Sequence, residues 1–188
     1  IIGEEAKEGV KATDAGDIMN RVWKTNRICE IIDLKSVLPD EFKDNVPPTF
    51  VIIIRKLLTS DEADALYAEQ QALDWDNKYY DTRRNKVLNK RRRHYLMYAK
   101  EGQEPDYENK KGRIIAWEQV PILKNAVDLL KELGGPKAEN LVCEGNKYKK
   151  FEKKTNVGIG WHGDSERKKV FAIKCGHSMD LRYRWYHR

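Results

Sequence analysis

The stretch GIGWHGDSE at residues 158–166 combines side chains that could bind a metal ion. Its glycines Gly158 and Gly160 disfavour a helix. In a strand, side chains two residues apart point to the same side, so His162 and Asp164 would face a common point. A histidine and a carboxylate are two of the three ligands in the facial triad of Fe(II) oxygenases, which leaves positions open for a co-substrate and oxygen. The alternative is a hydrogen-bonded structural pair on a loop.

Basic residues are concentrated in one segment. The chain has a formal net charge of +6 at pH 7, and much of the excess lies between Asp81 and Tyr95, in DTRRNKVLNKRRRHY. Arg91, Arg92 and Arg93 follow one another there. Such clustering is typical of a protein that binds a phosphate backbone. The alternatives are a solvated basic loop and a localisation signal.

The composition favours one globular domain with a charged surface. A length of 188 residues is enough for one domain with a core and for an extension. The residues are 40% hydrophobic and 35% charged, as in a globular protein with a well-solvated surface. The longest apolar run, residues 50–54, is too short to cross a membrane, and we expect no membrane association. Cys29, Cys143 and Cys175 lie far apart without zinc-site spacing. We therefore expect an intracellular, reducing compartment, cytoplasmic or nuclear.

The order of the expected elements indicates an α+β protein with a β-rich core. Residues 1–46 form an expected N-terminal extension that is partly helical and leans on the core. A strand over residues 50–54 precedes a helix that begins at Thr59 or Ser60 and ends near Trp75. Further elements are a helix that begins at Pro121 and strands over residues 95–98, 140–143, 158–162, 170–175 and 181–186.

Several motifs, in order along residues 48–188, resemble the AlkB-like branch of the 2-oxoglutarate- and Fe(II)-dependent dioxygenases. FVIIIRKLLTSDEADALYAEQQALDW is similar to the opening strand, helix and tryptophan of that family. AENLVCEGNKYKKFEKKTNVGIGWHGDSE is similar to its central signature, and VFAIKCGHSMDLRYRW to the hairpin that follows. The resemblance implies an AlkB-like domain over residues 47–188. Its core would be a double-stranded β-helix (jelly-roll) flanked by helices and incomplete at the C-terminal end.

The central signature implies roles for individual residues. His162 and Asp164 match the first two iron ligands of the family. Asn146 and Tyr148 match an Asn-x-Tyr pair that helps to hold 2-oxoglutarate. Glu166 matches an acidic position that faces the substrate base in some relatives.

The basic segment falls where the family has its nucleotide-recognition lid. The resemblance implies that Arg91, Arg92 and Arg93 hold phosphates of the substrate, and that Tyr95 and Tyr98 contact a nucleotide. For the two tyrosines, the alternative is that they are strand residues packed on the sheet.

Two residues of the family pattern have no match in this chain. The second iron histidine and the arginine that pairs with 2-oxoglutarate come after the hairpin in the family, so we expect both beyond Arg188. We do not expect His177 or His187 to be the third iron ligand. The chain is therefore expected to be a part of a longer protein.

The resemblance implies an enzyme with Fe(II) and 2-oxoglutarate as cofactors. Hydroxylation of an N-methylated base would release formaldehyde and restore the base, in DNA or RNA. The target base would have to leave the stack to reach the iron. The alternative is a non-catalytic AlkB-like module, structural or nucleic-acid-binding, within a larger assembly. The oligomeric state stays open.

Overall fold

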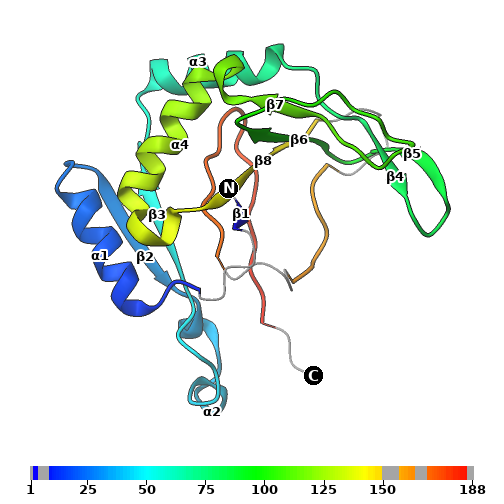
Figure 1. The fold of residues 1–188 in the computed structure, drawn as a ribbon. Helices are drawn as coiled ribbons and strands as arrows, with labels where there is room; N and C mark the ends of the chain where they lie inside the picture. The colour runs from blue at the N-terminus through cyan, green and yellow to red at the C-terminus, as the bar shows by residue number, and fades with distance from the viewer. Residues whose placement is uncertain (1, 4–8, 150–156, 164–168, 186–188) are drawn as a thin grey trace.

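A computed structural model describes residues 2–3, 9–149, 157–163 and 169–185 of the chain (Figure 1). Its strands are β1 (Ile2–Gly3), β2 (Ile28–Asp33), β3 (Phe50–Arg55), β4 (Lys78–Asp81), β5 (Lys86–Asn89), β6 (His94–Ala99), β7 (Ile114–Ala116) and β8 (Leu141–Lys147). Its helices are α1 (Ala12–Trp23), α2 (Asp40–Lys43), α3 (Ser60–Ala72) and α4 (Pro121–Gly134), with short 3-10 segments η1 (Leu34–Val37), η2 (Trp117–Gln119) and η3 (Gly135–Ala138). This mixture of helices and small sheets confirms the α+β class.

The beginning of α3 follows from its capping residues. The Thr59 side chain accepts a hydrogen bond from the backbone N–H of Glu62, and the Glu62 carboxylate accepts one from the backbone N–H of Thr59 at 2.8 Å. This reciprocal pair satisfies two N–H groups that have no partner within the helix. The predicted start is confirmed, and the helix ends at Ala72, three residues before the predicted end.

Helix α4 begins at Pro121, as predicted, and α3 caps it. The Glu69 carboxylate of α3 accepts hydrogen bonds from the backbone N–H groups of Ile122 and Leu123, at 2.8 and 3.0 Å. A carboxylate at a helix N-terminus is stabilising because it meets unpaired N–H groups and the positive end of the helix dipole. The contact fixes the two helices relative to each other.

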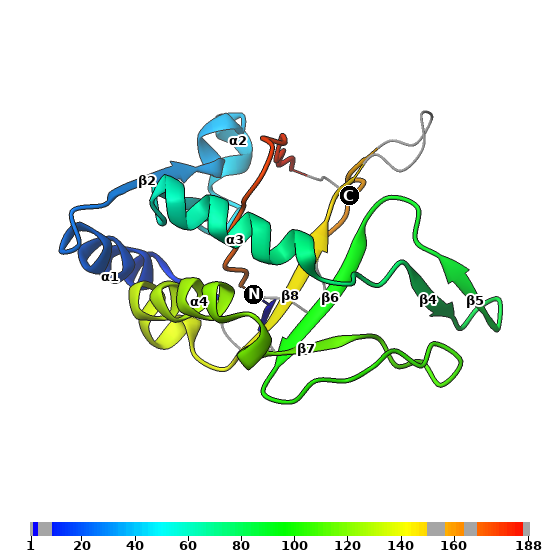
Figure 2. The ribbon, with the colours of Figure 1, turned by 90° about the horizontal axis from the view of Figure 1, so that it is seen from above.

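The central sheet has the strand order β1-β8-β6-β7, with β6 antiparallel to β8 and parallel to β7. Helices α3 and α4 cover one face of this sheet (Figure 2). The buried core between them combines side chains of both layers: Leu66, Leu96, Tyr98, Ile115, Val120, Leu123, Ala126, Val127 and Cys143. Alternation along a strand explains why Leu96 and Tyr98 both reach this core.

The N-terminal region packs against the rest of the chain. Strand β2 pairs with β3 over its whole length, from Ile28 opposite Arg55 to Asp33 opposite Phe50. Helix α1 packs on α4 in a second apolar cluster, built around Ile18, Val22 and Leu133. The described residues of this region are partly helical and contact the rest of the chain. The division into an extension of residues 1–46 and a domain of residues 47–188 stays a prediction, and β2 pairs with β3 across that boundary.

The strands predicted over residues 158–162, 170–175 and 181–186 are wrong for the described residues of these ranges, where no strand forms and Val170 makes only an isolated bridge. Gly158 has a φ of +128°, which interrupts an extended strand. The chain turns at Gly176, which lies close against the ring of Tyr67 in α3, and then runs back past β8 (Figure 1). The last described residue, Trp185, contacts the N-terminal region, because its indole N–H donates to the Leu34 carbonyl at 2.8 Å.

The sheets of the described part do not close into a barrel. The jelly-roll core implied by the resemblance therefore stays a prediction. None of the helices in residues 2–3, 9–149, 157–163 and 169–185 combines the length and apolar character that crossing a membrane requires.

Candidate functional site

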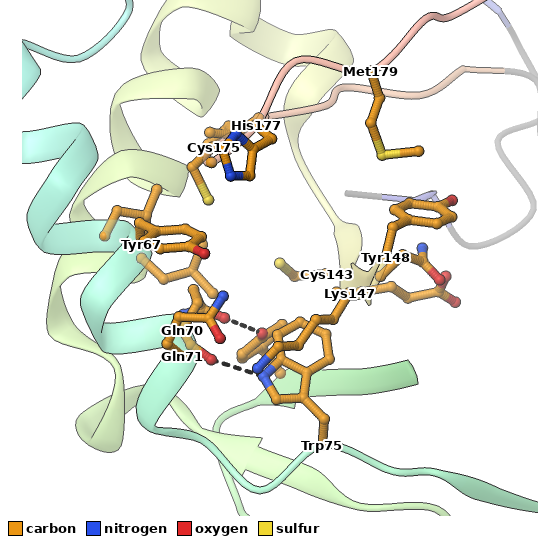
Figure 3. A pocket seen from close by; sticks show the side chains of 18 residues that line it. Tyr67, Gln70, Gln71, Trp75, Cys143, Lys147, Tyr148, Cys175, His177 and Met179 are labelled. Carbon is orange, nitrogen blue, oxygen red and sulfur yellow. Dashed lines mark hydrogen bonds between the residues drawn. The ribbon is translucent and has the colours of Figure 1, made fainter. Parts of the chain in front are cut away.

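A cavity of about 260 Å³ lies between α3, the end of β8 and residues 173–179 (Figure 3). Strand β8 has β6 on one side, whereas β1 pairs with only its first two residues, Leu141 and Val142. Consecutive residues of β8, from Cys143 to Lys147, line the cavity.

The two residues predicted to hold 2-oxoglutarate, Asn146 and Tyr148, both line this cavity. They stand two positions apart along the chain, a spacing that puts side chains on one face of an extended segment. The side-chain oxygen of Asn146 is buried and has no hydrogen-bond partner among the described residues. An unpaired buried amide oxygen costs about 1–3 kcal/mol, so it indicates a position where a ligand or water belongs.

Tyr98 also borders the cavity, but from within the core. It is only 4% exposed, its hydroxyl donates to the side-chain oxygen of Gln70, and its ring stacks on Trp117 with centroids 5.9 Å apart. Burial raises the pKa of the Tyr98 phenol well above its usual range, so the phenol stays protonated. Tyr98 is therefore a strand residue packed in the core. Its predicted contact with a nucleotide stays a prediction.

His162, the predicted iron ligand, lies on an exposed segment and is not among the residues that line the cavity. Its Nδ1 lies 2.7 Å from the carbonyl oxygen of Gly160. A carbonyl can only accept, so Nδ1 donates, and in the neutral ring the lone pair is then on Nε2. Asp164 and Glu166, the predicted second ligand and base contact, lie outside the described residues.

The segment that carries His162 is held by an aromatic contact. The guanidinium of Arg184 lies over the Trp161 ring, 4.4 Å from its centroid, although the Trp161 side chain is 54% exposed. This contact joins residues 157–163 to residues 169–185. Among the described residues, no group of three His, Cys, Asp or Glu side chains has the arrangement of a metal site.

The predicted phosphate contacts Arg91, Arg92 and Arg93 connect β5 to β6. Arg91 and Arg92 are exposed, and Arg93 is partly buried. Just before them, the ammonium of Lys90 lies over the ring of Tyr95, 4.6 Å from its centroid. The hairpin of β4 and β5 extends beyond this segment at the edge of the molecule (Figure 1).

The thiols of the cavity are protonated. Burial raises the pKa of Cys143, and partial desolvation by the cavity wall raises the pKa of Cys175, although Cys175 is exposed on its other side. Because the thiolate is the nucleophile, neither cysteine has the environment of a reactive one.

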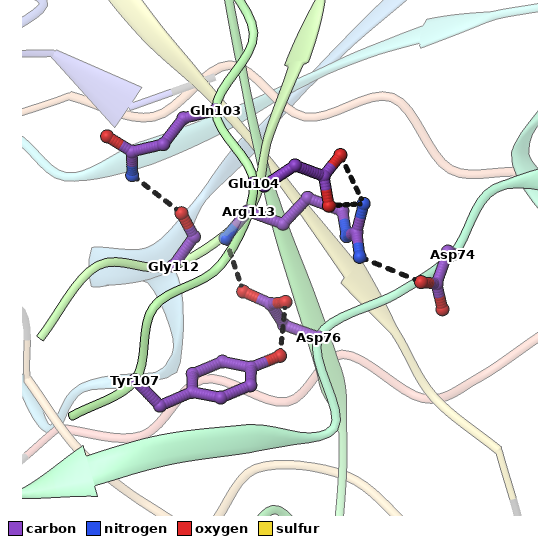
Figure 4. A network of polar contacts seen from close by, with 7 residues as sticks. All are labelled: Asp74, Asp76, Gln103, Glu104, Tyr107, Gly112 and Arg113. Atoms are coloured by element: carbon purple, nitrogen blue, oxygen red, sulfur yellow. Dashed lines mark hydrogen bonds and ion pairs between the residues drawn. The ribbon is translucent and has the colours of Figure 1, made fainter. Parts of the chain in front are cut away.

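The buried carboxylate of Asp76 is a residue that the sequence did not single out (Figure 4). It is 3% exposed and accepts hydrogen bonds from the Tyr107 hydroxyl and the backbone N–H of Arg113, both at 2.7 Å. The Arg113 guanidinium in turn contacts Asp74 and Glu104, each at 2.8 Å. The network fixes the loop before β7 to the segment after α3, and Asp76 of that segment forms an isolated bridge with Tyr95 of β6. The burial of Asp76 could not be predicted from the sequence, where its position directly after Trp75 is the only hint that it lies near the core.

The fold is that of an α+β protein with a cavity beside the last residues of β8 in its four-stranded sheet. The chain is 32% identical over 188 residues to an uncharacterized protein of Acanthamoeba polyphaga mimivirus, in a match that covers 98% of this chain and 71% of the viral protein. The chain therefore belongs to the family of that mimivirus protein. No protein-family model matches the chain. No solved structure matches it either.

Proposed function

We propose that the protein is a 2-oxoglutarate- and Fe(II)-dependent dioxygenase of the AlkB type, which oxidatively demethylates or hydroxylates a nucleic-acid base. In this proposal the core of the protein is a double-stranded β-helix. The observation that carries the proposal is the common location of Asn146 and Tyr148 in one cavity, where the buried Asn146 amide lacks a partner for its oxygen. These are the residues that the motif resemblance assigns to 2-oxoglutarate.

The chemistry of the cavity fits a small dicarboxylate. The Tyr148 hydroxyl and the Asn146 amide can each donate to a carboxylate oxygen. A 180° rotation of the Asn146 side-chain amide exchanges its oxygen and NH₂ group without changing its shape. The NH₂ group would then take the place of the unpaired oxygen and could donate to a carboxylate of the ligand. The volume of about 260 Å³ lies just below the range typical of ligand pockets, as expected for a ligand as small as a five-carbon dicarboxylate.

The His162 side chain fits a metal ligand. Histidine ligands commonly donate their second ring N–H to a carbonyl or carboxylate, which fixes the tautomer and the ring orientation. The bond from His162 Nδ1 to the Gly160 carbonyl has this form. Asp164 would supply the carboxylate ligand. When bound, Fe(II) and 2-oxoglutarate supply the oxygen activation that hydroxylates a C–H bond.

The basic segment supports a nucleic acid as the substrate. Arg91, Arg92 and Arg93 would neutralise phosphates and contribute salt-dependent affinity that is independent of base sequence. Glu166 would accept a hydrogen bond from an exocyclic amine of the base. The base would leave its stack to reach the iron.

Turnover of 2-oxoglutarate to succinate tests the proposal. We expect Asp164→Ala to abolish succinate formation by removing a metal ligand. The matched control is Asp180→Ala, which removes an exposed carboxylate paired with Arg182 at 2.7 Å and should leave turnover intact. Turnover that persists in Asp164→Ala would refute the iron site. Absence of any turnover in the folded, full-length natural protein would favour the non-catalytic module.

A further inference from the structure

Two basic runs that are far apart in the sequence meet at one end of the central sheet. The first, Lys90–His94, leads into β6, and the second, Lys147–Lys149, ends β8. In the antiparallel pairing of these strands, His94 lies directly opposite Lys147. Directly opposed residues have Cβ atoms about 4.5–5.5 Å apart, so the two runs are immediate neighbours. We call residues 90–94 and 147–149 the basic end of the sheet.

The side chains of the basic end are close enough to affect one another. The pKa of His94 is lowered first by burial and then by the nearby charges of Lys147, Lys90 and Lys149. Burial also lowers the pKa of Lys147, and Lys149 lowers it further. Because the pKa of His94 lies below 6.5, its ring is largely neutral at pH 7, and the positive charge of the basic end comes from its lysines and arginines. Close like charges such as these favour a bound anion.

Nearby acidic side chains do not cancel this charge. Asp76 is buried, and its two carboxylate oxygens accept hydrogen bonds from Tyr107 and from the backbone of Arg113. Glu144 lies three residues before Lys147 in β8, and it and Asp76 both act on Lys90. Against these two carboxylates stand the lysines and arginines of both runs, so the basic end has an excess of positive charge.

Aromatic rings accompany the lysines. The ammonium of Lys147 lies 5.6 Å from the centroid of the Trp75 ring, and that of Lys90 lies 4.6 Å from the centroid of Tyr95. Both Trp75 and Lys147 also line the cavity. Positive charge interleaved with aromatic rings is the pattern of surfaces that bind nucleic-acid strands, because phosphates meet the cations and bases meet the rings.

We propose that the basic end of the sheet is one continuous binding surface for the phosphodiester backbone of a nucleic-acid strand, and that Lys147 extends it to the mouth of the cavity. The second run, Lys147–Lys149, is the new part of this surface. Delivery of a base to the cavity rests on the proposed dioxygenase activity, whereas binding of the strand does not.

Fluorescence anisotropy with a short labelled oligothymidylate tests the surface, in the absence of Fe(II) and 2-oxoglutarate. We expect Lys147→Gln and Arg92→Gln each to weaken binding roughly fivefold, because each removes one phosphate contact. Each should also reduce the slope of log affinity against log salt by about 0.7. The double variant should show both losses together. Lys24→Gln, an exposed lysine at the end of α1, is the matched control and should bind like the parent chain.

Three results would overturn the proposal. One is a loss of binding in Arg92→Gln with none in Lys147→Gln, because the two runs would then not act as one surface. Another is failure of Lys147→Arg to restore affinity while its thermal midpoint matches that of the parent chain. The third is equally tight binding of polyglutamate, which carries charge but no bases. Since the titration needs no metal, failure of the iron site would leave its outcome unchanged.

Discussion

The two halves of the proposed active site are held in different ways. Asn146 belongs to β8, which pairs residue by residue with β6 and lies against the core that α3 and α4 cover. His162 belongs to residues 157–163, which form no strand and contact the rest of the described chain through single interactions such as that of Trp161 with Arg184. The cavity half can be preformed by packing, whereas the iron half depends on contacts that the metal itself would add.

The largest expected effect comes from the core of the packed half. Leu96 is fully buried in β6, so Leu96→Ala should lower the free energy of unfolding by about 2–5 kcal/mol through lost burial and a residual cavity. Ile159, beside the predicted iron ligand, is 47% exposed, and Ile159→Ala should change it by less than about 0.5 kcal/mol. Urea unfolding of both variants measures the difference. Similar losses in the two variants would contradict the contrast between the halves.

A smaller effect is expected from polar groups. Asp76→Asn weakens buried bonds to Tyr107 and Arg113 and should cost about 1.5–3 kcal/mol of unfolding free energy. Asp180→Asn removes an exposed carboxylate in residues 169–185 and should cost less than about 1 kcal/mol. Thermal and urea unfolding of the pair compare them. If Asp180→Asn were the more damaging variant, residues 169–185 would be held more tightly than their contacts indicate.

The smallest effect concerns pH. Burial and the lysines of the basic end hold the pKa of His94 below its ordinary value of 6.5, so the unfolded chain takes up this proton first as the pH falls. His94 therefore contributes a loss of stability that begins as the pH drops through 6.5 and is complete below the folded-state pKa. His94→Gln should make the decline of unfolding free energy between about pH 7 and pH 5 shallower. If the slope of unfolding free energy against pH were unchanged in this variant, the lysines of the basic end would not act on His94.

The starts of α3 and α4 could be predicted from local signals in the sequence. The pairing of distant strands could not be predicted from such signals. Thr59 with Glu62, and Pro121, mark helix starts that the structure confirms. The pairing of β2 with β3 and the meeting of His94 with Lys147 depend on register between distant segments, which periodicity cannot reveal. The motif resemblance implied that Asn146 and Tyr148 share a site. Both line the cavity, and their role toward 2-oxoglutarate stays a prediction.

The strand predicted around His162 failed for a physical reason. A strand needs a neighbour for its backbone groups as well as suitable residues, and residues 157–163 have no ladder partner in the part of the chain that the structure describes. The sequence alone also gave no reason to expect Asp76 in the core, because a buried carboxylate depends on donors that only the fold assembles, here Tyr107 and Arg113.

An anaerobic titration with Fe(II) and 2-oxoglutarate tests the central claim most directly, by following the metal-to-ligand charge-transfer band of the chelate. We expect a band that saturates in the parent protein, is absent in Asp164→Ala, and requires more 2-oxoglutarate in Asn146→Ala. The Asp180→Ala variant should titrate like the parent. A band that survives Asp164→Ala unchanged, or the absence of a band in the folded, full-length natural protein, would contradict the assignment of an iron and 2-oxoglutarate site.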